Sequence, residues 1–385
     1  MNRIFADLPT TIFEEMSAAA RRHGAINLGQ GFPDGPGPED VRRAAADAVM
    51  NGNNQYPSMM GTAELRAAIA EHYGRLQGVL LDPESECLVT SGATEALAAS
   101  ILGLVSPGEE VVLFEPAYDA YLPLVRQAGG IPVRVKLKPP AWRFTAEDLR
   151  AAIGPKTGLV IINNPLNPAG AVWPRADLEL LAAAIEGTPA VVVSDEVWEH
   201  VVFDGRAHAS VLSVPGLRER AVKIGSAGKM FALTGWKVGL VAAAPPLLRA
   251  VAKTHQFLAF TTPPNLQAAV AYGLAKDARF FADAQAGLAR SRDRFSAGLA
   301  AAGFSVLPSA GTYFVCVDLA PLGLTDDAAF CRRLVAEAKV AAVPVSAFFA
   351  DDPVRNVVRF CFAKADAVLD EAIERLARAA PALAA

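Results

Sequence analysis

The sequence predicts an α/β protein with a mostly parallel main sheet and a smaller α+β unit toward the C-terminus. Between about residues 61 and 245, segments with helical periodicity alternate with short apolar runs, and this alternation is typical of α/β folds. The runs are apolar on both faces, which indicates strands covered by helices on each side. After Pro264 the pattern changes to a long helical stretch followed by strand-like runs.

The α/β region begins with two helices around one strand. Residues 61–78 form an amphipathic pattern that ends at Gly78, and residues 86–91 predict a strand that leads into a helix over 93–105. Pro107 and Gly108 end that second helix. Further apolar runs predict strands at residues 111–114, 158–163, 190–194, 221–225 and 237–244.

The C-terminal unit is expected to begin with a helix over about 277–302. The strand-like runs FSVLP, TYFVCVDL and NVVRFCF follow, with one helix before the last run and another after it. The first 40 residues are rich in Gly and Pro from Gly29 to Pro38 and contain no sheet-forming run of their own. We expect them to pack against the C-terminal unit.

Composition excludes several classes of protein. Of the 385 residues, 52% are hydrophobic, which supplies a sizeable core and excludes disorder. The net charge of −4, from 36 basic and 40 acidic residues, produces no field that would recruit nucleic acid or an anionic membrane. The N-terminus does not resemble a signal peptide, and Pro or charge interrupts every apolar stretch before about 18 residues. A soluble cytoplasmic protein is expected.

The cysteines also favour a cytoplasmic location. Cys87, Cys316, Cys331 and Cys361 show no zinc-binding pattern and no disulfide framework. We expect buried free thiols in a reducing compartment and no metal site.

A basic stretch predicts an anion site. From Arg220 to Lys276 the chain holds no Asp or Glu but several lysines and arginines. Within it, Lys229 and Lys237 lie among glycines and apolar residues, where burial of an unpaired ammonium is costly. Desolvation lowers the pKa of a lysine, so that its amine can form a Schiff base with a carbonyl. A loop of ordinary surface lysines is the alternative.

Two predicted strands end in polar residues. Asp195 ends the run over 190–194, and ligands of α/β sheets bind at the carboxyl ends of strands, where this carboxylate can face a ligand cation. A helix-start or surface aspartate is the alternative. The segment NNPLNPAG at residues 163–170 follows another strand, and it either points an Asn side chain into the same crevice or forms a simple turn.

Two further segments contain groups that can bind an anion. Residues 91–96, SGATEA, form a strand-to-helix turn whose free backbone N–H groups favour a phosphate, although any such turn favours Gly and Thr. Arg359 interrupts an apolar strand pattern and requires an anion, either a ligand carboxylate or a structural ion pair. The segment GQGFPDG at 29–35 is not a dinucleotide motif, because Asp34 replaces the third glycine and no strand precedes it.

In order along the chain, these segments resemble those of the class I/II pyridoxal-phosphate-dependent aminotransferases of fold type I, in particular the kynurenine/glutamine and bacterial methionine aminotransferase branch. The motifs that carry the resemblance are INLGQGFPDGPGP, NQYPSMMGTAELR, TSGATEAL, EPAYDAY, NNPLNPAG, SDEVWEH, SAGKMFALTGWKVG and VVRFCFAK. The resemblance covers essentially the whole chain. It implies an N-terminal arm and part of a small domain at 1–40, a large cofactor domain with a seven-stranded sheet at 41–285, and a small domain at 286–385.

The resemblance also implies roles for single residues. Lys229 holds the aldehyde of pyridoxal 5'-phosphate as a Schiff base and later moves the proton between Cα and C4′. Asp195 pairs with the pyridinium nitrogen, which keeps the ring an electron sink. Asn167 hydrogen-bonds the ring hydroxyl, and Tyr118 stacks on the ring. The expected phosphate ligands are Gly92, Ala93, Thr94, Ser226 and Lys237, with Tyr56 reaching from a second subunit.

For the substrate, the resemblance implies that Arg359 binds the α-carboxylate, helped by Asn167 and the backbone at Gly31. Phe13 and Phe260 fall where this branch lines its side-chain pocket. One position departs from the family pattern, since Trp198 stands where a Tyr usually shares the ring hydroxyl with the Asn, and an indole can donate but not accept or ionise.

The expected function is therefore an aminotransferase for neutral or aromatic L-amino acids of the methionine, glutamine, phenylalanine or kynurenine type, with a 2-oxo acid as acceptor. The same residues serve a cysteine-conjugate or cystathionine β-lyase, because both reactions share a carbanion, and a non-catalytic cofactor-binding regulator is a remote alternative. The expected role of Tyr56 predicts a homodimer with shared sites.

Overall fold

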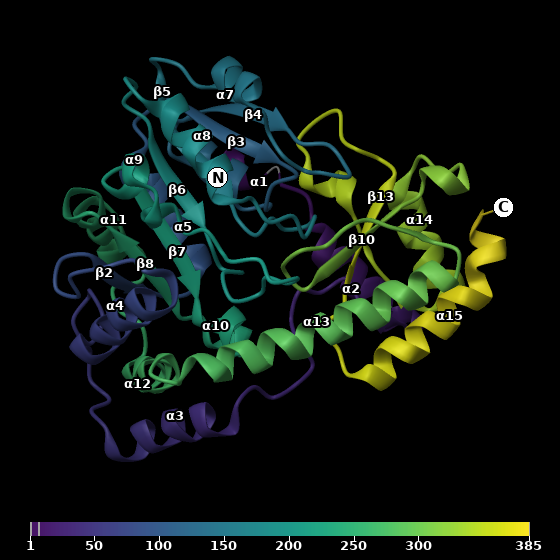
Figure 1. Ribbon diagram of the computed structural model, residues 1–385, viewed down its shortest axis with the longest axis horizontal. Helices are drawn as coiled ribbons and strands as arrows, with labels where there is room; N and C mark the ends of the chain where they lie inside the picture. Colours follow the sequence, from purple (N-terminus) through teal and green to yellow (C-terminus); the bar gives the residue numbers. More distant parts are fainter. Residues whose placement is uncertain (1, 7, 385) are drawn as a thin grey trace.

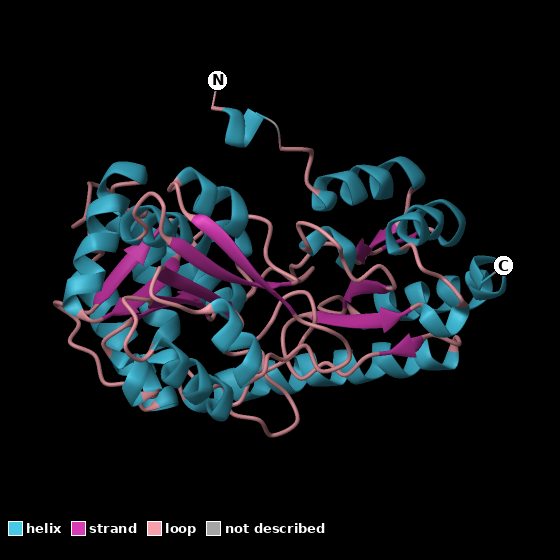
Figure 2. Ribbon diagram, turned by 90° about the horizontal axis from the view of Figure 1, so that it is seen from above, coloured by secondary structure: helices cyan, strands magenta, loops and turns pink. Residues whose placement is uncertain are grey.

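The computed structural model describes residues 2–6 and 8–384. A seven-stranded sheet and a four-stranded sheet lie in opposite halves of the molecule (Figure 1, Figure 2). Helix α13 (Ala278–Ala301) runs along both halves. Near its start, Phe281 packs into the core of the larger sheet, whereas Phe295 and Leu299 pack into the core of the smaller one.

The seven-stranded sheet has the order β2-β8-β7-β6-β5-β3-β4. All of its pairs are parallel except those of β8, which is antiparallel to both neighbours. The strands are β2 (Cys87–Thr90), β3 (Glu110–Glu115), β4 (Ile131–Lys136), β5 (Thr157–Asn163), β6 (Val191–Asp195), β7 (Ala221–Ser226) and β8 (Gly239–Ala243). The predicted α/β class with a mostly parallel seven-stranded sheet is confirmed.

Helices cover both faces of this sheet. One face carries α4 (Ala63–Gln77), α8 (Arg175–Ile185) and α12 (Pro264–Leu274), and the other carries α5 (Ala93–Leu104), α6 (Tyr121–Gln127) and α11 (Pro245–Leu258). Successive residues of β5 enter the two cores in turn, with Ile161 on one side and Ile162 on the other. This double burial explains why the strands read as continuous apolar runs.

Strand β4 has no counterpart in the sequence analysis. It lies at the edge of the sheet, paired with β3. Its first residue, Ile131, is exposed and most of its other residues are only partly buried. An edge strand of this kind lacks the continuous apolar run that reveals the inner strands.

The smaller sheet has the order β12-β13-β10-β9 and is antiparallel throughout. Its strands are β9 (Ser305–Val306), β10 (Phe314–Asp318), β12 (Val343–Pro344) and β13 (Val357–Cys361), and α14 (Asp327–Arg333) and α15 (Asp366–Ala384) pack beside it. The predicted boundaries at residues 40 and 285 stay a prediction.

The N-terminal segment contacts both halves of the molecule. Helix α2 (Ile12–His23) packs on the smaller unit, as expected, whereas α1 (Arg3–Ala6) contacts α6 of the larger one. The prediction that this segment forms no strand is wrong, because β1 (Ile26–Asn27) pairs in parallel with β11 (Val340–Ala341). Two residues are too few to produce a periodic pattern.

The remaining helices are short connections apart from α3, which packs against α12. They are α3 (Glu39–Asn51), α7 (Ala146–Ala152), α9 (Pro215–Arg218) and α10 (Ala227–Met230). All four cysteines are buried free thiols, as expected. Within residues 2–6 and 8–384, no helix combines the length and the apolar character needed to cross a bilayer.

Candidate active site

A cavity of about 370 Å³ gathers almost all of the predicted site residues. Its walls come from the N-terminal segment, the loops at the carboxyl ends of β2, β5, β6 and β7, and the strand β13. The predicted residues that line it are Phe13, Gly31, Gly92, Ala93, Thr94, Tyr118, Asn167, Asp195, Trp198, Ser226, Lys229, Lys237 and Arg359. Among the described residues, Tyr56 and Phe260 are predicted site residues that do not line it.

Lys229 projects into this cavity from α10. The side chain of Ser226 caps the helix by accepting a hydrogen bond from the Lys229 amide at 3.4 Å. The ammonium Nζ donates to the carbonyl of Gly31 at 2.7 Å and lies 4.6 Å from the ring centre of Trp198. Burial lowers the pKa of Lys229 to about 8, and the nearby charge of Arg359 acts in the same direction. The amine is thus prepared for nucleophilic and proton-transfer chemistry.

Asp195 ends β6 and is 5% exposed. Its Oδ2 accepts a hydrogen bond from the hydroxyl of Tyr121 at 2.6 Å, and its Oδ1 accepts from the amide of Val197 at 3.3 Å. Burial raises its pKa to about 6, although these two hydrogen bonds oppose the shift. The Nδ2 of Asn163 holds the Asp195 carbonyl at 2.9 Å. A buried carboxylate fixed in this way suits a cationic ligand group.

The start of α5 forms a recess for an anion. Gly92, with φ at 82°, precedes the helix, and the first residues of α5 line the cavity together with Lys237. A Cβ atom on Gly92 would lie 3.0 Å from Cε and 3.3 Å from Nζ of Lys237. The positive φ favours a glycine here, and the missing side chain leaves room for the lysine beside the helix N-terminus, where the free amides and the helix dipole favour a phosphate.

Lys237 differs from its prediction in one respect. Its place among glycines and apolar residues predicts a costly buried ammonium, but the residue is exposed at the cavity, in a left-handed backbone conformation with φ at 54°. The neighbouring Gly235 is exposed as well, whereas Gly239 is buried at the start of β8. The burial argument therefore holds for Lys229 only.

Arg359 is fully buried in β13 beneath an aromatic enclosure. Its Nη1 donates to Oδ1 of Asn167 at 2.8 Å and its Nη2 donates to the carbonyl of Gly29. The guanidinium carbon lies 3.8 Å from the ring centre of Phe314 and 5.2 Å from that of Phe13. Burial lowers its pKa to about 10.

Among the described residues, the hydrogen-bond acceptors of Arg359 are an amide oxygen and a backbone carbonyl rather than a carboxylate, and its Nε is buried without a partner. The structural ion pair that the sequence left open is therefore not formed within that part of the chain. A buried guanidinium with spare donors suits the carboxylate of a ligand.

Tyr56 and Phe260 lie together outside the cavity. Their rings meet edge to face at 5.5 Å, and they are 82% and 42% exposed. Their predicted roles, at the phosphate of a second subunit and in the side-chain pocket, stay predictions.

The basic stretch from Arg220 to Lys276 is not one anion site. Lys223 pairs with Glu196 and Glu199, and Lys276 pairs with Asp40. Arg220 donates to backbone carbonyls of residues 185, 188 and 190. The carboxylates that pair with these lysines come from distant parts of the sequence. The local absence of Asp and Glu therefore does not indicate unpaired lysines.

Some residues of the site escape the sequence analysis. Tyr121 fixes Asp195, Asn163 fixes the strand end, and the hydroxyl of Tyr313 donates to the carbonyl of Lys229 at 2.6 Å. The second tyrosine of the EPAYDAY motif and the first asparagine of NNPLNPAG are the available signals for the first two. Tyr313 lies in an ordinary strand pattern, and no signal marks it.

Comparison with known proteins gives consistent matches over almost the whole chain. The model of the family "Aminotransferase class I and II" matches residues 23–376. The chain is 46% identical to a probable N-succinyldiaminopimelate aminotransferase of Mycobacterium tuberculosis over 95% of both chains, and 43% identical to the methionine aminotransferase of Escherichia coli over 96% of both.

Solved structures agree. The structure that identified a methionine aminotransferase function in Escherichia coli superposes with a TM-score of 0.94 over 96% of this chain and 97% of that one, at 43% identity. The N-succinyldiaminopimelate aminotransferase of Mycobacterium tuberculosis gives the same TM-score at 46% identity, over 97% and 98% of the two chains.

Proposed function

This chain belongs to the class I and II aminotransferases, and we propose that it transfers the amino group of a neutral or aromatic L-amino acid to a 2-oxo acid. It is an aminotransferase of fold type I and depends on pyridoxal 5'-phosphate. The observation that carries the proposal is the meeting of Lys229, Asp195 and Arg359 in one cavity.

The residues of the cavity fit this cofactor. The recess between Gly92 and Lys237, which a Cβ atom would fill, suits the phosphate, and the buried carboxylate of Asp195 suits the protonated ring nitrogen. Asn167 and Trp198 would hydrogen-bond the ring hydroxyl, and Tyr118 would stack on the ring face. Lys229 would hold the aldehyde. When bound, the cofactor supplies an electron sink for the negative charge that develops at the substrate Cα.

The chain's own groups bind the substrate and move its proton. The free donors of Arg359 would bind the substrate carboxylate, and Asn167 orients the guanidinium by accepting a hydrogen bond at its Oδ1. A substrate carboxylate bound there would bring the substrate Cα toward Nζ of Lys229, which would take the α-proton. A pKa of about 8 leaves part of the Lys229 amine unprotonated near neutral pH, as a general base requires.

The walls of the cavity favour neutral side chains. Apart from Lys229, Lys237 and Arg359, which have roles above, no cationic residue of the described part of the chain lines it. The rings of Phe13, Phe32 and Phe314 and the amide of Gln30 form the side toward the N-terminal segment. We therefore infer that methionine or an aromatic amino acid is a better donor than one with a carboxylate at the end of its side chain.

The exposure of Tyr56 supports a second proposal about assembly. A tyrosine and a phenylalanine that meet outside the cavity, both exposed to solvent, suit a contact with a second copy of this chain. We infer a homodimer in which Tyr56 reaches the partner's phosphate site. The four buried free thiols favour the cytoplasm as its location.

The test is the visible absorption spectrum of the purified holoenzyme before and after addition of one amino acid with no oxo acid present. L-methionine and L-phenylalanine are expected to remove the yellow absorption band of the bound cofactor. L-aspartate and N-succinyl-diaminopimelate are expected to remove this band much more slowly. Faster loss with either acidic donor would overturn the substrate class. A persistent band with release of pyruvate and ammonia from a cysteine conjugate would instead identify a β-lyase.

Lys229→Ala supplies the matched control for the chemistry. It removes the proposed base, so the half-reaction is expected to fall by at least about a thousandfold, within the usual range for a general base that also binds covalently. Retained turnover in this variant would contradict the role of Lys229.

A further inference from the structure

A buried ion cluster lies on the other side of the turn that follows β6. The residues of this turn divide between two sides, and Val197 lies on the cavity side. Asp195 and Trp198 line the cavity, whereas Glu196 and Glu199 are buried away from it. The backbone amide of Glu196 donates to the carbonyl of Ile224 at 2.8 Å, so the start of the turn stays paired with β7.

Lys223 of β7 is the cation of this cluster. Its side chain is fully buried, and its Nζ forms ion pairs with Oε2 of Glu196 and, at 2.6 Å, with Oε2 of Glu199. The same Nζ lies 4.6 Å from the ring centre of Tyr73. One ammonium thus ties both ends of the turn to the strand beside it.

Further hydrogen bonds fix both oxygens of each carboxylate. Glu196 accepts from the amide of Val211 at 2.8 Å and from Nε2 of His208 at 2.7 Å. Glu199 accepts from the hydroxyl of Tyr73 at 3.1 Å and from Nε2 of Gln77 at 2.6 Å. The turn is therefore anchored to helix α4 and to the loop at 208–211 as well as to β7.

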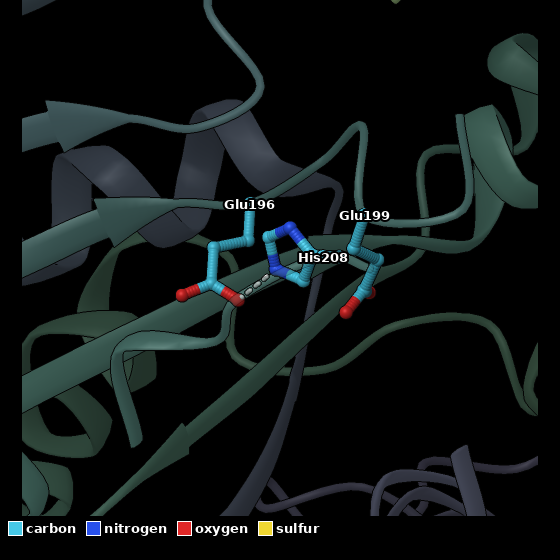
Figure 3. A group of neighbouring side chains, drawn as sticks. All are labelled: Glu196, Glu199 and His208. Carbon is cyan, nitrogen blue, oxygen red and sulfur yellow. Dashed lines mark hydrogen bonds and ion pairs between the residues drawn. The ribbon is translucent and has the colours of Figure 1, made fainter. Parts of the chain in front are cut away.

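The cluster has the spacing of a metal site but holds its own cation. Ligand atoms of Glu196, Glu199 and His208 lie within 4.8 Å of one another, and Figure 3 shows these three side chains converging. Lys223 places its ammonium on both carboxylates, so it already offsets one of their two negative charges. Although burial alone would raise it, Lys223 holds the pKa of the Glu199 carboxyl below its usual range.

We propose that Lys223 is a positioning residue for amino transfer, because its two ion pairs set the turn that presents Asp195 and Trp198 to the cofactor. Without the ammonium, two carboxylates would share a buried space, and one would have to take up a proton or move. Either change is transmitted through residues 196–199 to the carboxylate of Asp195. The inference rests on the assignment of Asp195 to the ring nitrogen made above.

The test compares Lys223→Met with wild type. Methionine keeps most of the side-chain volume and removes the charge. The dissociation constant of pyridoxal 5'-phosphate, measured by titration of the apoenzyme, is expected to rise at least tenfold, and the pH midpoint of the visible absorption of the holoenzyme is expected to move. Both are measured at a temperature where circular dichroism shows a folded chain.

Lys276→Met is the control, since it removes the same charge from an ion pair with Asp40 remote from the cavity, and it should leave both values unchanged. If Lys223→Met does not fold, Glu199→Gln replaces it, with an expected rise of about threefold because one of the two ion pairs is lost. A lower unfolding temperature with unchanged dissociation constant and midpoint would overturn the proposal. Failure of wild type to bind the cofactor would instead overturn the assignment of Asp195.

Discussion

Tyr121, the first residue of α6, donates a hydrogen bond to Oδ2 of Asp195 across 2.6 Å, although 74 residues separate the two in the chain. Both side chains are buried. Burial raises the pKa of Asp195 to about 6, and the tyrosine hydroxyl lowers it again by stabilising the ionised form. The ionised form is the one that pairs with a protonated ring nitrogen, so Tyr121 supports cofactor binding through Asp195.

Tyr121→Phe is therefore expected to weaken binding of pyridoxal 5'-phosphate by about tenfold, since a hydrogen bond to a charged group contributes about 1.5 kcal/mol or more. Titration of the apoenzyme measures this. Tyr272→Phe removes a hydroxyl that contacts Asp40 outside the cavity and should leave the affinity unchanged. Equal affinities for Tyr121→Phe and wild type would contradict the role of the bond.

Trp198→Tyr tests the departure from the family pattern. The indole ring lies 4.6 Å below Nζ of Lys229, and tryptophan attracts a cation more strongly than tyrosine does. The protonated form of the lysine nitrogen loses stabilisation in the variant, so the pH midpoint of the visible absorption should fall by about half a unit. Trp198→Phe separates the effect of the ring from that of the new hydroxyl. An unchanged midpoint in a spectral pH titration would exclude this interaction.

Arg359→Lys should raise the KM for the amino acid by about 10- to 100-fold, because an ammonium cannot form the two parallel hydrogen bonds that a guanidinium offers a carboxylate. The dissociation constant of the cofactor should change little. Steady-state kinetics at saturating oxo acid measure the KM. Arg294→Lys removes a comparable pair of hydrogen bonds from a surface ion pair with Asp370, and its KM should equal that of wild type. An unaltered KM in Arg359→Lys would show that another group binds the substrate carboxylate.

His72 and His200 predict a loss of stability in acid. Their Nε2 atoms lie 2.9 Å apart, and burial lowers their pKa values to about 4 and about 3. The unfolded chain takes up protons near pH 6.5 while the folded chain does not, so the free energy of unfolding decreases as pH falls from 6.5 toward 4. The slope approaches about 1.4 kcal/mol per pH unit for each histidine.

Urea unfolding at pH 7.5, 6.5 and 5.5 measures this slope. His72→Gln should flatten it, whereas His23→Gln, at an exposed helix end, should not. The same slope in His72→Gln as in wild type would show that other groups cause the acid sensitivity.

Much of the fold and the site could be predicted from local sequence. Strands buried on both faces, such as β5 with Ile161 and Ile162, read directly as apolar runs. Asp195 stands out because it ends such a run, and Lys229 stands out because it lies among glycines and apolar residues in a stretch without Asp or Glu. Strand β4 did not stand out, since most of its residues are only partly buried at the edge of the sheet. Strand β1 has two residues, which are too few to show a periodic pattern.

The sequence by itself determined the α/β class and the order of the main elements, because these depend on periodicity, and its motifs indicated most groups in the cavity through their resemblance to a known family. Only the tertiary structure decided which charges meet. Lys223, in a segment without acidic residues, finds Glu196 and Glu199 across β6 and β7, and Tyr121 finds Asp195 from another helix. Electrostatic pairing depends on distance in space, and folding sets that distance independently of separation along the chain.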